Sequence, residues 1–258
     1  MRFIDTHCHL DSILAKLGDA DYGAFRARLP PEYEGCITIS CDPLSIGPTL
    51  KLMEHPEVHG AFGIHPHDAK AYGPGLEKEL EAALAHPKAV AWGEIGLDYH
   101  YDFSPRDVQR DAFARQIRRG VALGKPLIIH TREAEADTLE IMQGETPADW
   151  RIHVHCFTSS PDMAGRLLAH FPNLCLGLTG IVTFRNAHEL QEVARTTPLE
   201  RLLLETDGPY LAPIPHRGQP AHPGHIPLIA AKLADLKGTT VEAVYAAARE
   251  NTRRVYGI

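Results

Sequence analysis

The chain has 258 residues, of which 44% are hydrophobic and 23% charged, and its formal net charge is −7 with histidine neutral. This composition is ordinary for a soluble globular protein, and the length matches one α/β barrel. No apolar run reaches the ~18 residues of a membrane span, and no apolar leader is visible, so we expect a cytoplasmic protein. The negative charge excludes a surface that is basic throughout, so any nucleic acid must be contacted locally.

Short apolar or β-branched runs alternate along the chain with segments that can form helices. Eight runs predict strands at residues 3–6, 36–40, 58–63, 89–94, 126–130, 152–156, 174–178 and 202–205. Further helices are predicted at 75–85, 161–170, 186–196, 227–236 and 241–255. This alternation indicates a parallel sheet, and eight strands favour a TIM (β/α)₈ barrel in a single domain over residues 1–258. An open, doubly wound sheet is the structural alternative.

The most clearly punctuated helix is predicted to follow the fourth strand. Ser104 is a good N-cap, and Pro105 suits the first helical position. Apolar residues then recur every four positions from Phe113 to Val121, and Gly124 follows as a stop signal. We therefore expect a helix between these two punctuation points.

Cysteine and histidine contents bear on redox state and metal binding. The five cysteines include no CxxC pair and form no visible disulfide framework, so reduced thiols are expected. Sixteen histidines are an unusual number for this length and favour a search for metal ligands.

Metal-binding residue types stand where several predicted strands end. The first strand leads into His7-Cys8-His9, and alternate residues share a face, so both histidines can hold one ion while Cys8 points away. Four further candidates follow at later strand ends: Glu94, His130, His155 and Asp207. Each alone could be a hydrogen-bonded structural residue, but a barrel brings all strand ends to one mouth. Together they predict a metal site.

The residue types also bear on which metal is bound. Four imidazoles and two carboxylates suit Zn, Mn, Fe, Ni or Co, and Mg with more oxygen ligands. Two ions about 3.5–4 Å apart need a bridging group, and a carboxylate serves well. Glu94 is the predicted bridge between two divalent metal ions.

Six segments in order along the chain resemble the TatD-related deoxyribonucleases, metal-dependent hydrolases with an amidohydrolase-like barrel. The matching segments are 3–11, 63–67, 93–99, 126–132, 155–157 and 203–211. The resemblance implies a TIM-like barrel and two divalent ions. One ion is then held by His7, His9, Glu94 and Asp207, and the other by Glu94, His130 and His155. It also implies DNA as the substrate, cut by metal-dependent hydrolysis that includes 3′-5′ exonuclease action; no obligate protein partner is indicated.

Small departures from the family pattern occur near the expected site. Thr131 replaces a frequent serine and keeps the hydroxyl, whereas Ser159 stands where glycine is common. Gln219 occupies a position where lysine is usual, which weakens the expected attraction of that loop for phosphate. His67, beside Pro66, is expected to be structural.

Phosphodiester hydrolysis by a metal-activated water is the predicted reaction. Asp207 is predicted to act as general base and Glu94 to support catalysis as the bridge between the ions. His65 and Arg132 are predicted to bind the phosphate, and His65 can also help the leaving oxygen. Glu205 shares a face with Asp207 and is predicted to contact substrate, to orient the site, or to bind a further ion.

Two other functions fit the same residues. The first is hydrolysis of another ester, amide or lactone, because a barrel of this kind does not fix the substrate. The second is a metal-binding interaction protein without catalysis, against which the complete ligand set argues.

Overall fold

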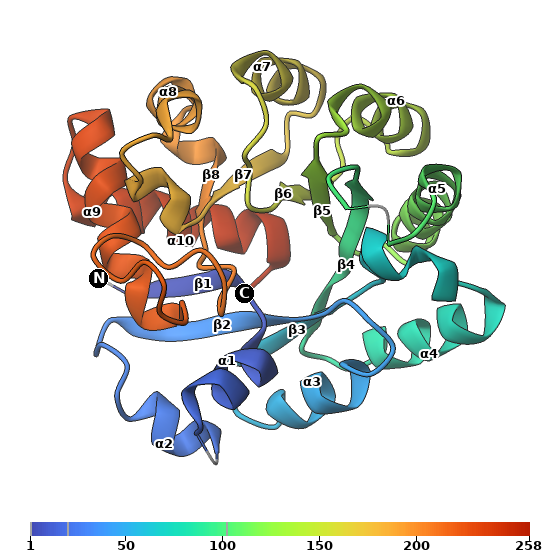
Figure 1. Ribbon diagram of the computed structural model, residues 1–258, viewed down its shortest axis with the longest axis horizontal. Helices are drawn as coiled ribbons and strands as arrows, with labels where there is room; N and C mark the ends of the chain where they lie inside the picture. The colour runs from blue at the N-terminus through green and yellow to red at the C-terminus, as the bar shows by residue number, and fades with distance from the viewer. Residues whose placement is uncertain (1, 20, 102) are drawn as a thin grey trace.

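Residues 2–19, 21–101 and 103–258 are described by the structure, a computed structural model. Eight parallel strands form its central sheet in the order β1 to β8, with helices around the outside (Figure 1). The strands are β1 Phe3–Cys8, β2 Tyr33–Ser40, β3 Val58–Phe62, β4 Ala89–Asp98, β5 Leu127–Arg132, β6 Ile152–Val154, β7 Leu174–Leu178 and β8 Leu202–Leu204. The predicted TIM barrel is confirmed.

The sheet closes on itself where the segment after β8 meets β1. The backbone N–H of His9 donates to the carbonyl of Gly208 at 2.7 Å. The buried Asp5 carboxylate accepts from the backbone N–H and the hydroxyl of Thr206 at 3.0 and 2.6 Å. These bonds join the first and last strands, so the alternative of an open doubly wound sheet is excluded.

The helices alternate with the strands along the chain. They are α1 Leu10–Leu17, α2 Tyr22–Arg26, α3 Ile46–Leu52, α4 Pro74–Leu84, α5 Arg106–Ala122, α6 Glu135–Glu145, α7 Pro161–His170, α8 His188–Thr196, α9 Ile226–Lys237 and α10 Val241–Tyr256. Short 3₁₀ helices lie at η1 Pro66–Ala71, η2 Gly180–Thr183, η3 Leu199–Arg201 and η4 Pro223–His225. The five helices predicted by range correspond to α4, α7, α8, α9 and α10, with ends shifted by at most two residues.

The predicted start of α5 is wrong by one residue. The helix begins at Arg106, and its N-cap is Pro105 rather than Ser104. The hydroxyl of Ser104 instead donates to the carbonyl of His67 at 2.8 Å, so this side chain fastens η1 to the segment just before α5. Gly124 follows the helix with φ +67°, in agreement with its predicted role as a stop.

Six of the eight strand ends differ from prediction. β1 and β5 end two residues later than predicted, and β3 ends one residue earlier. β4 continues past Glu94 to Asp98, whereas β6 and β8 end before His155 and Glu205. Cys156 and Asp207 have φ values of +43° and +52°, in the left-handed region, so the chain leaves the extended conformation close to these points. Site residues after β6 and β8 therefore lie on loops that rise from the strand ends.

Two apolar cores fix the barrel. The larger packs the outer face of the strands against the helices. The smaller fills the barrel interior and consists of Ile37, Ile39, Ala61, Val90, Ala91, Ile128, Cys175, Leu203, Val255 and Tyr256. Val255 and Tyr256 come from the end of α10, so this helix closes one end of the barrel. The functional groups collect at the other end, as is usual for this fold.

Two further sequence expectations concern membranes and thiols. Among the described residues, no helix combines the length and apolar character needed to cross a bilayer. All five cysteines are unpaired, which confirms the expectation of free thiols.

Candidate metal centre

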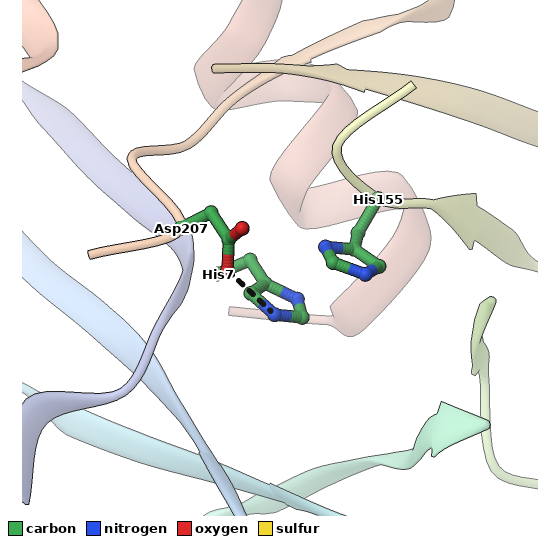
Figure 2. A group of neighbouring side chains, drawn as sticks. All are labelled: His7, His155 and Asp207. Carbon is green, nitrogen blue, oxygen red and sulfur yellow. Dashed lines mark ion pairs between the residues drawn. The ribbon is translucent and has the colours of Figure 1, made fainter. Parts of the chain in front are cut away.

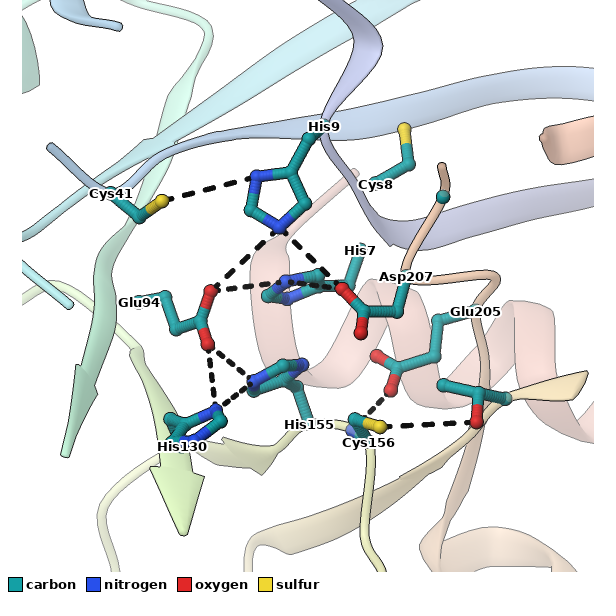
Figure 3. Close-up of polar contacts among 12 residues, drawn as sticks. His7, Cys8, His9, Cys41, Glu94, His130, His155, Cys156, Glu205 and Asp207 are labelled. Atoms are coloured by element: carbon teal, nitrogen blue, oxygen red, sulfur yellow. Dashed lines mark hydrogen bonds and ion pairs between the residues drawn. The ribbon is translucent and has the colours of Figure 1, made fainter. Parts of the chain in front are cut away.

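All six predicted metal ligands meet at the mouth of the barrel (Figure 3). Five of them line a pocket of about 720 Å³: His9, Glu94, His130, His155 and Asp207. His7 is fully buried and lies against them from below. Residues from β1, β4, β5 and the loops after β6 and β8 thus share one small volume, although nearly the whole chain separates them in sequence.

The two carboxylate oxygens of Glu94 face two different sets of imidazoles. Its Oε2 atom lies 3.4 Å from Nε2 of His7 and 4.0 Å from Nε2 of His9. Its Oε1 atom lies 2.7 Å from Nε2 of His155 and 2.9 Å from Nδ1 of His130. One buried carboxylate between two groups of nitrogen donors is the arrangement required of a bridge between two cations.

Asp207 completes the set around Oε2 of Glu94. Its Oδ1 atom lies 3.5 Å from Nε2 of His9 and 3.7 Å from Nε2 of His7 (Figure 2 shows the latter pair). The backbone N–H of Asp207 donates to the carbonyl of His7 at 2.9 Å, which holds the residue in its left-handed conformation. The rings of His7 and His155 stack with centroids 3.8 Å apart, so the two sets of donors are in direct contact.

Several ring nitrogens at this site are suited to ligate a cation. The Nε2 atom of His7, which faces Glu94 and Asp207, is buried and makes no hydrogen bond, and Nε2 of His155 and Nδ1 of His130 face Oε1 of Glu94. Burial, reinforced by the charge of His155, lowers the pKa of His7 to about 3, so its imidazole is neutral with a free lone pair. Neutral imidazoles and ionised carboxylates are the donors that divalent transition metals prefer. The residues present therefore fit the implied metals.

The charge balance of the pocket also favours cations. Burial acts to raise the pKa of Glu94, but nearby His155 and His65 outweigh it and hold the pKa well below its usual value. Burial acts to lower the pKa of His130, yet hydrogen bonds to Asp98 and Glu94 raise it to about 9. Ionised carboxylates therefore create a site in which positive charge is stabilised.

Asp98 is a site residue that the sequence analysis did not select. Its Oδ2 atom lies 3.4 Å from Nε2 of His130 and 3.0 Å from Nε2 of His67. Its Oδ1 atom accepts from the backbone N–H of His100 and of Tyr101 at 2.9 and 3.2 Å. The carboxylate is thus pinned behind His130, where it can fix the ring with Nδ1 turned toward Glu94. His67, expected to be structural, shares this carboxylate.

The alternation within β4 is a signal that could have found Asp98. Glu94, Gly96 and Asp98 are spaced by two residues, so they share one face of the strand. Gly96 has φ +150°, and a Cβ atom there would collide with the backbone of His130, so only glycine permits this close approach.

His65 is placed as a hydrogen-bond donor rather than as a metal ligand. Its Nδ1 atom accepts from the backbone N–H of His67 at 3.1 Å, so the neutral ring carries its proton on Nε2. Burial lowers the pKa of His65 well below its usual value, which keeps the ring neutral. The Nε2–H group lies 3.5 Å from Oε1 of Glu94 and lines the pocket. Ligand atoms of His65, His67 and Asp98 also converge, but the proton on Nε2 of His65 favours hydrogen-bond donation by this ring.

The two other predicted substrate contacts have different outcomes. Arg132 lines the pocket, where its guanidinium lies 5.1 Å from the ring centroid of Tyr101, so it is positioned to reach a phosphate. Glu205 is 0% exposed, and it accepts from the backbone N–H of Cys156 beneath the pocket floor. The predicted contact between Glu205 and substrate is therefore wrong for this structure, because the floor covers the carboxylate.

Glu205 instead belongs to a buried polar column. Its Oε2 atom lies 2.9 Å from Nε2 of His153, whose Nδ1 atom lies 2.6 Å from the hydroxyl of Tyr256. Burial raises the pKa of Glu205 to about 8. A Cβ atom at Gly177 would meet His153 and Glu205, so this glycine makes room for the pair. The column supports the loop that carries His155, in line with the orienting role also predicted for Glu205.

Comparison with protein families agrees with this geometry. Residues 4–257 match the family model described as TatD related DNase. The chain belongs to this family. It is a TatD-family metal-dependent hydrolase, and the resemblance stated from six sequence segments is confirmed.

Individual relatives refine this placement. The chain is 44% identical to the human protein named 3′-5′ RNA nuclease TATDN2 over 99% of its own length, but it spans only 35% of that protein. It is 36% identical to the Escherichia coli protein named uncharacterized metal-dependent hydrolase YcfH, covering 100% of this chain and 97% of that one. The solved structure of YJJV, a TatD homolog from Escherichia coli, superposes with a TM-score of 0.89 at 26% identity, covering 100% and 98% of the two chains.

Proposed function

We propose that this protein is a two-metal nuclease that removes nucleotides from the 3′ end of a nucleic acid strand. The observation that carries the proposal is the position of Glu94, whose two oxygens face separate sets of ligands. The family description names DNases, and the human relative is named an RNA nuclease. DNA is the substrate predicted from the sequence, and RNA is the second substrate to be tested.

Two groups of residues would hold the ions. The first consists of His7, His9 and Asp207 with Oε2 of Glu94, and the second of His130 and His155 with Oε1 of Glu94. When bound, two divalent ions supply positive charge that lowers the pKa of an attacking water and offsets the charge of the phosphate.

Asp207 is the proposed general base. Burial acts to raise its pKa, but a hydrogen bond with His9 and the charge of His155 outweigh it, so the carboxylate is ionised at neutral pH. It lines the pocket and can accept the proton of the attacking water as the new oxygen–phosphorus bond forms.

The phosphate and the leaving oxygen need separate partners. Arg132 at the rim can bind two phosphate oxygens at once through its planar fork. The Nε2–H group of His65 points into the pocket and can donate to the leaving oxygen as its bond to phosphorus breaks. Both assignments agree with the roles predicted from the sequence.

The proposal is tested by digesting 5′-labelled single- and double-stranded DNA and RNA with added Mg, Mn, Zn or Co. We expect a ladder that shortens from the 3′ end only with divalent metal, and no ladder from a Glu94→Gln variant purified in parallel. A protein that binds metal but cuts no strand would contradict the proposal and support a non-catalytic binding protein. Faster turnover on an ester, amide or lactone panel would support the alternative hydrolase.

A further inference from the structure

Exposed aromatic rings gather at the mouth of the barrel. Among the described residues, the exposed large aromatic side chains are Tyr101 at 42%, Phe103 at 58% and Tyr210 at 51%. Tyr101 and Tyr210 both line the pocket that contains Glu94 and Asp207. The other exposed large hydrophobic side chains of the described residues are aliphatic. A cluster of exposed rings at the pocket opening favours binding of a ligand with planar aromatic groups.

Tyr101 and Phe103, on the segment between β4 and α5, form the first stacking platform. The rings of Tyr101 and Phe103 stack with centroids 5.3 Å apart and an interplanar angle of 11°. His67 meets both rings edge-on, with centroids 5.6 and 4.9 Å away, which fixes their tilt. The guanidinium of Arg132 lies 5.1 Å from the Tyr101 centroid. Flat apolar faces and one cation are thus assembled in advance on this rim.

The second platform follows β8 on the other side of the pocket. The ring of Tyr210 has the ammonium group of Lys16 4.8 Å from its centroid, and His9 meets it edge-on at 6.1 Å. Strands β4 and β8 are four places apart in a closed ring of eight, so they lie on opposite sides of the barrel (Figure 1). The two platforms therefore stand on either side of the ligand pocket.

The charge of the molecule limits how a strand can be held. The net charge of −7 leaves general attraction for phosphate weak, so contacts at the mouth must supply the binding. In a nucleotide, the base can stack on the aromatic ring while the neighbouring cation contacts the phosphate. Bases in a duplex have both faces covered by their neighbours, whereas unpaired bases can stack on aromatic side chains.

We propose that Tyr101–Phe103 and Tyr210 each stack one unpaired base, on opposite sides of the phosphate that is cut. The two nucleotides at the cut are then held by base stacking on these rings and not by a basic groove. This inference rests on the proposed nuclease function and deepens it.

The test measures binding and turnover with strands that have or lack a base. Short single strands of DNA and of RNA carry either normal nucleotides or an abasic unit at one of the two 3′-terminal positions. Binding is followed by fluorescence anisotropy on hydrolysis-resistant phosphorothioate strands, and turnover on normal strands. The variants are Tyr101→Ala, Phe103→Ala and Tyr210→Ala, with Tyr101→Trp as the conservative variant. Leu123→Ala, 44% exposed where α5 ends, removes exposed apolar surface at the opposite end of the barrel as a matched control.

We expect Tyr101→Ala and Tyr210→Ala each to raise the Kd and KM about 5- to 100-fold with little change in kcat, and Tyr101→Trp to restore wild-type values. On the strand that lacks the stacked base, wild type and alanine variant should become equal. The DNA and RNA arms should lose affinity alike, since both present the same base faces.

Three results would overturn the inference. They are alanine variants that bind like wild type, variants whose loss is the same with and without the base, and wild-type protein that binds no strand. If the strands bind through the platforms but none is cut with any metal, the nuclease proposal is wrong and the inference of base stacking is retained.

Discussion

Two groups of histidines in this molecule differ in what surrounds them. At the mouth, His7, His9, His130 and His155 direct nitrogens at the carboxylates of Glu94 and Asp207. In the loop between β8 and α9, the ring of His225 stacks on His216 and His222 with centroids 4.6 and 4.1 Å apart. Among the described residues, none of these three belongs to a cluster of converging ligand atoms.

The difference shows that histidine content alone does not identify a metal site. Stacked rings in the loop bury each other's faces, and burial lowers the pKa of His225 to about 3 without a carboxylate to oppose it. At the mouth, a similar number of histidine rings is accompanied by two carboxylates, whose negative charge favours cation binding. The carboxylates therefore define the site, and changes to them should have the largest effects.

The largest effect is expected from Glu94→Gln, which removes the charge shared by the two sets of ligands. We expect fewer than two ions per chain by elemental analysis and a fall in turnover of about 10⁴-fold or more. A variant that keeps two ions and wild-type turnover would show that Glu94 is not the bridge.

Asp207→Asn should separate catalysis from metal binding. Asparagine keeps an oxygen ligand but cannot take a proton, so we expect metal content to be retained while kcat falls by about 10²- to 10⁴-fold. Steady-state kinetics together with metal analysis checks both parts. Unchanged kcat would eliminate Asp207 as the general base.

Asp98→Asn tests the carboxylate behind His130. Loss of this charge should loosen the ring and weaken metal affinity by about 10- to 100-fold, measured by Mn²⁺ titration. Asp137→Asn is the control, because Asp137 pairs with Arg110 on the helical exterior and should leave affinity unchanged. Equal affinities in the two variants would mean that Asp98 does not position His130.

The smallest effect is expected from the loop histidines and concerns acid stability. The pKa of His225 is about 3 in the folded chain against about 6.5 unfolded, so the unfolded chain binds the extra proton first as pH falls. Its contribution is absent above about pH 6.5, and stability is lost below that value. His225→Phe keeps a ring without this proton, so the loss of unfolding free energy between about pH 7 and 5 should shrink by about 1–2 kcal/mol.

Denaturant unfolding at the two pH values measures this change, and metal content should equal that of wild type. A variant with the same pH dependence as wild type would show that His225 is not buried as a neutral ring. Loss of metal from the variant would remove the distinction between the two histidine groups.

The fold could be predicted where the sequence signals were regular. Strand alternation located all eight strands, and α4, α7, α8, α9 and α10 were predicted within two residues at each end. The helices α1, α2, α3 and α6 were not predicted individually. The first three have eight residues or fewer, too short for a period to emerge, and α6 mixes buried Thr138 with apolar residues.

Site residues were predicted where they lie at the predicted ends of strands. Asp98 was missed because β4 continues beyond its predicted end. Glu94 was taken as the end of the fourth strand, so Asp98 was not selected although it continues the same face. Whether Glu205 can contact substrate depends on which side of the pocket floor it occupies. Its spacing of two residues from Asp207 suggested a shared face and did not show that Glu205 lies beneath the floor. The turn at Asp207, with φ +52°, separates the carboxylate that lines the pocket from the one beneath its floor.

The most direct test of the metal centre is anomalous diffraction from crystals soaked in Mn²⁺. Two peaks should appear at the mouth, one beside Oε2 of Glu94 among His7, His9 and Asp207, and one beside Oε1 between His130 and His155. A single peak, or peaks bound by other residues such as the His216–His225 stack, would contradict the assignment of Glu94 as the bridge of a two-metal site.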